Sequence, residues 1–183
     1  YEAMEDELSA QIAKSETDYF NALSREQAAA IAAAAAQKPS NGSSAAPSSS
    51  GFVFPLAYAT KITDAYGYRI HPLSGTKKWH NGVDFGAAAG TAILATKSGT
   101  VTTAAYSAAW GYYVVINHGD GYSSLYAHQP SCSVSVGDYV TQGQTIGYVG
   151  STGNSTGNHL HLEVWKGGSK ANAVNPRGYI PIR

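Results

Sequence analysis

The chain has 183 residues, enough for one domain of ordinary size together with an appended segment. Its 12 basic and 12 acidic side chains balance, which excludes a strong electric field that would draw the chain to nucleic acid or to an anionic membrane. The single cysteine, Cys132, excludes an internal disulfide and a zinc site built from several cysteines.

The first part of the chain is predicted to hold a helix followed by a linker. Residues 1–37 contain no Gly or Pro and space Met4, Leu8 and Ile12 four apart, as on one face of a helix. The apolar stripe is thin, so we expect a coiled-coil-like spacer that offers a surface to a coiled-coil or membrane-tethered partner. The Ser, Pro and Gly content of residues 38–51 predicts a flexible linker. Because the chain begins at Tyr1 without a leader, any export signal or anchor is expected to lie upstream.

Residues 52–183 are predicted to form a mainly β domain. Tyr, Val, Ile and Thr become frequent here, Gly recurs at short intervals, and no helical periodicity remains. The runs YYVVINHG and YSSLYAH are separated by Asp120-Gly121, a dipeptide that favours a tight hairpin turn. We therefore expect many short strands, with these two paired antiparallel.

Three histidines of the β domain lie in segments that are predicted to be strands. His159 and His161 are two residues apart, so on a strand both imidazoles point to one side while Leu160 points to the other, into the core. In YSSLYAH the same alternation places Tyr126 and His128 on a common side of their strand. These histidines are candidates for metal binding or for proton transfer.

A fourth histidine is paired with a carboxylate in the segment HNGVD. Gly82 disfavours a helix there, and on an extended backbone His80 and Asp84 fall on one side. A catalytic zinc ion needs three nitrogen or oxygen ligands, one open position for water, and a nearby group that moves protons. The four histidines and Asp84 supply side chains of the right kinds for both tasks.

Three segments that hold these residues resemble the signature motifs of a known family. HNGVDFGA, SLYAH and GNHLHLEV are similar to the three motifs of the M23 metallopeptidases, the lysostaphin and LytM type endopeptidases, and they occur in the same order. The similarity runs from about Tyr66 to about Pro176, so it covers nearly all of the β domain and none of the predicted helix. The resemblance implies an antiparallel β-sandwich of the duplicated hybrid type, with a groove over the metal.

Carried over position by position, the resemblance implies a role for all five candidates. His80, Asp84 and His161 would be the ligands of one zinc ion, with His128 and His159 as catalytic histidines that do not bind the metal. It also implies a zinc-dependent endopeptidase that hydrolyses peptide cross-links or stem peptides of bacterial peptidoglycan. Such a substrate places the protein outside the cytoplasm.

Several points stay open at this level. The family resemblance gives no role for His71, His118 or Glu163, and it does not say which catalytic histidine is the base or which peptide bond is cut. A non-catalytic cell-wall binding or activator protein with a retained metal site is the main alternative. The segment VSVGDYVTQGQTIGYVG resembles hairpins of lipoyl and biotinyl carriers, but no lysine lies between Thr100 and Val164 to carry the cofactor. Phosphate-accepting histidine carriers and an iron facial triad are further alternatives, and metal content separates them.

Overall fold

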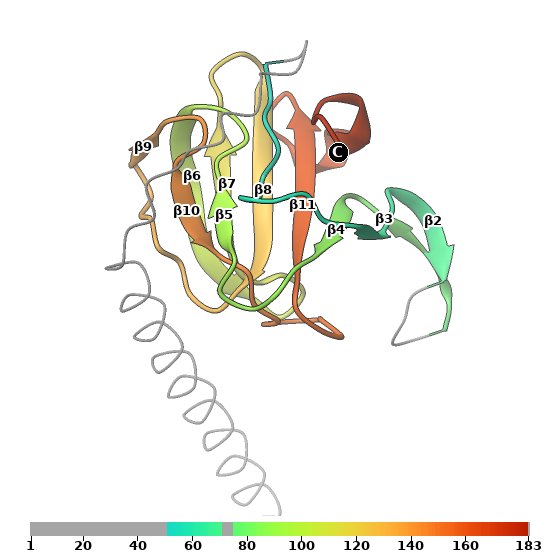
Figure 1. The fold of residues 1–183 in the computed structure, drawn as a ribbon. Helices are drawn as coiled ribbons and strands as arrows, with labels where there is room; N and C mark the ends of the chain where they lie inside the picture. Colours follow the sequence, from blue (N-terminus) through green and yellow to red (C-terminus); the bar gives the residue numbers. More distant parts are fainter. Residues whose placement is uncertain (1–50, 71–74, 183) are drawn as a thin grey trace, which may run out of the picture. The chain divides into compact units, whose positions relative to one another are not determined.

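The computed structural model of the chain describes residues 51–70 and 75–182 (Figure 1). The predicted helical spacer 1–37 and the linker up to residue 50 lie outside the described residues, as does His71. These parts of the domain division stay predictions. In the described ranges, no helix has both the length and the apolar character needed to span a membrane.

Strands dominate the described part of the chain, and only two short 3-10 helices accompany them. In chain order the elements are β1 Ile62–Asp64, β2 Gly67–Ile70, β3 Lys77–His80, β4 Val83–Gly86, β5 Ala92–Leu94, β6 Gly99–Ser107, β7 Gly111–Asn117, β8 Tyr122–Gln129, β9 Tyr139–Val140, β10 Thr145–Tyr148, β11 His159–Lys166, η1 Lys170–Asn172, β12 Ala173–Val174 and η2 Pro176–Gly178. The predicted mainly β fold is confirmed.

One large antiparallel sheet carries the architecture. Its strand order is β1-β4-β11-β8-β7-β6-β9, and β12 pairs with the C-terminal part of β11, beyond the segment that pairs with β4. The predicted hairpin is confirmed, because β7 and β8 pair antiparallel around the turn that contains Asp120 and Gly121. Gly121 has a φ of 84°, a left-handed conformation that glycine adopts without steric cost. Strand β11 thus lies in the middle of the sheet, between β4 and β8.

The main hydrophobic core lies between this sheet and the small sheet formed by β5 and β10 (Figure 1). Ile93 of β5 and Ile146 of β10 pack into the same buried cluster as Leu160 and Leu162 of β11. Both leucines are fully buried, which confirms that they point into the core as predicted. The opposite face of β11 carries the histidines, so the core fixes the strand that presents them.

A chain of hydrogen bonds links the partly buried His118 to two fully buried residues of β8 and to Thr96, which follows β5. The Nδ1 of His118 lies 3.0 Å from the carbonyl oxygen of Ser98, and its Nε2 lies 2.9 Å from the hydroxyl of Ser124. The Ser124 hydroxyl is in turn 2.8 Å from the hydroxyl of Tyr126. That Tyr126 oxygen accepts a hydrogen bond from the backbone N–H of Thr96. Buried polar groups need such partners, so His118 has a structural role remote from the other histidines.

Candidate metal centre

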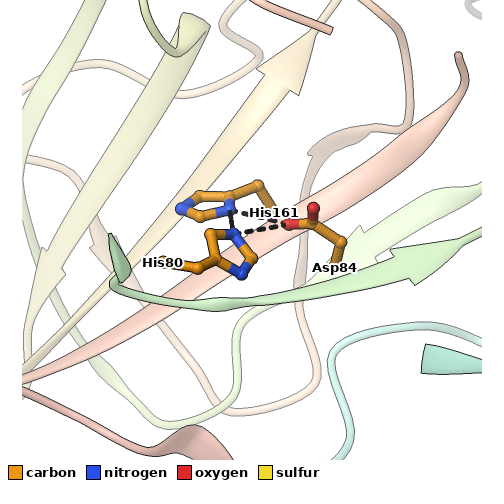
Figure 2. A group of neighbouring side chains, drawn as sticks. All are labelled: His80, Asp84 and His161. Carbon is orange, nitrogen blue, oxygen red and sulfur yellow. Dashed lines mark hydrogen bonds and ion pairs between the residues drawn. The ribbon is translucent and has the colours of Figure 1, made fainter. Parts of the chain in front are cut away.

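Three side chains from three strands converge on one face of the large sheet (Figure 2). They are His80 at the end of β3, Asp84 in β4 and His161 in β11, and all three are buried. Oδ1 of Asp84 lies 2.7 Å from Nδ1 of His161 and 3.3 Å from Nε2 of His80. The two ring nitrogens are 3.0 Å apart. One donor atom from each residue therefore surrounds a common point.

Strand pairing and a glycine together bring these donors into place. Asp84 and His161 are direct partners in the β4–β11 register, so their side chains lie on the same face of the sheet. His80 reaches them differently, because β3 belongs to the separate β2–β3 sheet and the chain bends between the two strands. A Cβ on Gly82 would collide with the carbonyl oxygen of Leu162 and lie 2.8 Å from Cε1 of His161. The predicted convergence of His80 and Asp84 is found, but a single extended strand does not produce it.

Hydrogen bonds orient both imidazoles toward the shared point. Nδ1 of His80 lies 3.0 Å from the carbonyl oxygen of Ala65, an acceptor that requires a proton on Nδ1 and leaves Nε2 facing the site. In His161 the roles of the nitrogens are reversed, since Nε2 lies 3.0 Å from Oε1 of Glu163 and Nδ1 faces the site. Each ring therefore presents one nitrogen to the centre and is anchored by the other.

Charge at the centre matches what a divalent cation needs. Burial raises the pKa of Asp84, but hydrogen bonds from His161 and His80 outweigh it and hold that pKa well below its usual range. Burial lowers the pKa of His161, yet hydrogen bonds to Asp84 and Glu163 raise it to about 9. Without a metal ion the imidazole of His161 is therefore protonated at neutral pH, and a cation bound at Nδ1 has to replace that proton.

The donor set fits a zinc ion. Two imidazole nitrogens and one carboxylate oxygen are the ligands that catalytic zinc sites use, with one position left open. Ligands bound at about 2.0–2.2 Å in a tetrahedral arrangement lie roughly 3.3–3.6 Å from one another. The donor separations of 2.7, 3.0 and 3.3 Å are close to this, so small movements accommodate the ion. Asp84 and Glu163 together supply two buried negative charges that a dication balances.

The two remaining candidates, His128 and His159, lie beside this donor set. Their rings stack in a tilted arrangement with centroids 4.6 Å apart, and Nε2 of His159 lies 3.8 Å from Oδ2 of Asp84. Each ring is held through Nδ1, by the carbonyl oxygens of Thr152 and Gly157 respectively. Burial lowers the pKa of His128 to about 4, so this imidazole is neutral at physiological pH. A neutral ring with a free Nε2 is suited to accept a proton.

A bulge in β8 turns His128 toward the centre and overturns one prediction. Val114 pairs with Tyr126 and Tyr112 pairs with Gln129, so β8 carries one extra residue between these pairs. His128 has a φ of 63° and is the single non-glycine residue with positive φ in the described ranges. Tyr126 points into the main core, whereas His128 faces the metal centre. The predicted common side for these two residues is therefore wrong, because the bulge interrupts the alternation.

Glu163 is a member of the site for which the sequence provided no role. It follows His161 by two residues on β11 and so lies on the same face, which was the available signal. Burial raises its pKa, but the hydrogen bond with His161 outweighs this and holds the pKa below its usual value. The carboxylate is therefore an anion that contacts a candidate metal ligand.

The centre lies at the bottom of an open cleft of about 680 Å³. The β2–β3 ribbon contributes Lys78 and Trp79 to its lining, and Trp79 is half exposed. Trp110 from the β6–β7 turn and residues 154–158 before β11 contribute further lining. A cleft of this size, with polar groups converging at its floor, admits an extended peptide.

Comparison with known proteins agrees with the geometry. The model of peptidase family M23 matches residues 78–176. The DD-carboxypeptidase/endopeptidase Mpg of Neisseria meningitidis is 41% identical over 121 residues, which are 66% of this chain and 28% of that protein. The peptidoglycan DD-endopeptidase ShyC of Vibrio cholerae is 42% identical over 109 residues, 60% of this chain and 25% of that protein. The chain thus spans about a quarter of the length of these curated relatives.

Solved structures give the same answer. A zinc-containing peptidase from Vibrio cholerae superposes with a TM-score of 0.61 at 34% identity, over 68% of this chain and 38% of that one. The catalytic domain of lysostaphin from Staphylococcus simulans superposes with a TM-score of 0.61 at 35% identity, over 66% of this chain and 91% of that domain. The matched residues 78–176 contain all five candidate side chains. The chain belongs to peptidase family M23.

Proposed function

We propose that this chain is a zinc-dependent endopeptidase that hydrolyses peptide cross-links of bacterial peptidoglycan. The observation that supports it best is a three-donor set, His80, Asp84 and His161, beside two imidazoles that are each anchored to a backbone carbonyl through Nδ1. A non-catalytic cell-wall binding protein would not need both features at one site. The relatives named as peptidoglycan DD-endopeptidases favour a DD-peptide bond as the bond that is cut.

In the proposed zinc site, each histidine ligand binds through the ring nitrogen that faces the other donors, while its second ring nitrogen is held by a hydrogen bond to the protein. His80 and His161 would bind one zinc ion through Nε2 and Nδ1 respectively, and Asp84 through its carboxylate. When bound, the ion supplies a Lewis acid that polarises a carbonyl oxygen and lowers the pKa of a water molecule to about 7. The surrounding side chains then have to move protons and position the peptide.

His128 and His159 are the groups proposed to move those protons. Their Nε2 atoms lie on the cleft side, because Nδ1 of each ring is engaged by a backbone carbonyl. In the proposed mechanism one imidazole takes a proton from the attacking water and one hydrogen-bonds to the oxyanion or protonates the departing amine. The left-handed backbone of His128, with its φ of 63°, places its ring at the cleft.

The proposed substrate implies an extracytoplasmic location, in the cell wall or the periplasm. The proposed role of residues 1–37 is to link the peptidase domain to a coiled-coil or membrane-tethered partner. Comparing cell-wall binding by the whole chain with that of a version starting at Phe52 tests this role. Phe52 is a suitable start because it is buried in the main core.

Digestion of purified peptidoglycan tests the proposed function. The zinc-loaded chain is expected to release muropeptides whose masses show hydrolysis of a cross-link between two stem peptides. A chelator such as 1,10-phenanthroline should stop the release, and added zinc should restore it. Unchanged muropeptide profiles with zinc-loaded protein, on both D-alanyl cross-linked and glycine-bridged cell walls, would refute the endopeptidase proposal.

A further inference from the structure

Three functional side chains form a row on one face of β11. His161, Glu163 and Trp165 alternate with the core residues Leu162 and Val164, so all three point away from the main core. Hydrogen bonds link the three side chains. Nε2 of His161 donates to Oε1 of Glu163, at 3.0 Å, and Nε1 of Trp165 donates to Oε2 of Glu163, at 2.6 Å. Both carboxylate oxygens are therefore engaged by N–H donors of the same strand.

The surroundings of Glu163 show that its charge is matched to the metal centre. The side chain is only 2% exposed, and burying a carboxylate is costly unless a cation or several donors compensate it. In the part of the chain that the structure describes, no lysine or arginine forms an ion pair with it. Its partner at Oε1 is the imidazole of His161, whose other ring nitrogen lies 2.7 Å from Oδ1 of Asp84 in the donor set. A metal ion bound at Nδ1 of that ring would take the place of one imidazole proton and keep this buried carboxylate compensated.

Trp165 is itself held in place by packing. Its ring lies 6.5 Å from that of Trp110, and Nζ of Lys170 lies 4.2 Å above the Trp110 ring. Trp165 also belongs to a second buried cluster with Val115 and Leu125. Because the tryptophan cannot turn freely, its N–H fixes the plane of the Glu163 carboxylate, which in turn fixes the imidazole of His161.

From these contacts we infer that Glu163, braced by Trp165, is a positioning residue that aims Nδ1 of His161 at the zinc ion and strengthens it as a ligand. The inference rests on the proposed zinc site and assigns no contact between Glu163 and the ion or the substrate. A carboxylate that accepts the distal N–H of a metal-bound imidazole holds its orientation and makes the other nitrogen a better donor.

The test is the zinc affinity of the full 183-residue chain, measured by competition with a chromophoric chelator. Glu163→Gln keeps the shape and an acceptor oxygen but removes the charge, and it should weaken zinc binding about 10- to 100-fold. Glu163→Ala should weaken it at least as much. Trp165→Phe keeps an aromatic ring and removes only the N–H donor, so a smaller loss is expected.

Asp120→Asn is the matched control. It neutralises a carboxylate of the β7–β8 turn that pairs with Lys97, and it should leave zinc affinity unchanged. The unfolding midpoint of the metal-free protein separates positioning from mere stabilisation: a structural role lowers this midpoint and leaves the Kd for zinc unchanged. If Glu163→Ala does not fold, Glu163→Gln decides.

A Kd for zinc within twofold of wild type in Glu163→Gln would overturn the inference. A loss of zinc affinity in Asp120→Asn equal to that in Glu163→Gln would also overturn it. The outcome is separable from the proposed function. If wild type binds zinc but releases no muropeptides, the endopeptidase proposal fails while the comparison of Kd values still decides the role of Glu163.

Discussion

His161→Ala is expected to abolish zinc binding at micromolar zinc and, with it, all peptidoglycan hydrolysis. The substitution removes one of three protein ligands and leaves the carboxylates of Asp84 and Glu163 buried without the imidazole that separates them. If one ligand supplies about a quarter of the roughly 10–16 kcal/mol of a four-ligand zinc site, its loss weakens binding by about 2.5–4 kcal/mol, roughly 60- to 700-fold. Zinc content after gel filtration and muropeptide release are the two measurements.

His118→Ala serves as the control for that experiment. It also removes a largely buried imidazole, but one that belongs to the polar chain through Ser124 and Tyr126. Its expected effect is a lower unfolding midpoint with one zinc ion still bound per chain. Retention of a full equivalent of zinc by His161→Ala would contradict its assignment as a ligand.

His128→Asn is expected to separate catalysis from metal binding. Asparagine tolerates the left-handed backbone that His128 adopts, with its φ of 63°, and it lacks a basic nitrogen. Zinc affinity should stay close to that of wild type, because His128 is not in the donor set. Loss of a general acid or base should lower kcat about 10²- to 10⁴-fold.

The measurement is the initial rate of muropeptide release by the zinc-loaded variant, with His159→Asn assayed in parallel. His159 lies closer to Asp84, so its substitution tests whether the second imidazole contributes comparably. Wild-type rates in both variants would exclude imidazole acid-base catalysis at this site. A loss of zinc in either variant would instead place that histidine among the ligands.

Much of the site was predictable because its residues lie in short segments with strand periodicity. The alternation of His159, Leu160 and His161 correctly placed the imidazoles opposite the core. The Asp120-Gly121 turn correctly predicted the β7–β8 pairing, since turn chemistry is local. The mainly β, antiparallel class follows from the same periodicity. The finer expectation of a duplicated hybrid-type sandwich stays a prediction, as does the helical spacer.

What could not be predicted depends on contacts between distant residues. The bulge that turns His128 is held by the carbonyl oxygens of Trp110 and Thr152, which accept from its backbone N–H and from Nδ1. Nothing within YSSLYAH indicates those partners. Gly82 was expected to disfavour a helix, but its structural reason is the close approach of Leu162 across the strand pair. The role inferred for Glu163 depends on its contacts with Nε2 of His161 and with the indole N–H of Trp165, which the sequence does not show.

Anomalous scattering at the zinc absorption edge, from crystals of the zinc-loaded chain, tests the central claim most directly. We expect one anomalous peak per chain, about 2.0–2.2 Å from Nε2 of His80, a carboxylate oxygen of Asp84 and Nδ1 of His161. His128 and His159 should remain outside bonding distance of the ion. No peak at this position, or an ion held by other side chains, would contradict the proposed metal centre and the hydrolytic function built on it.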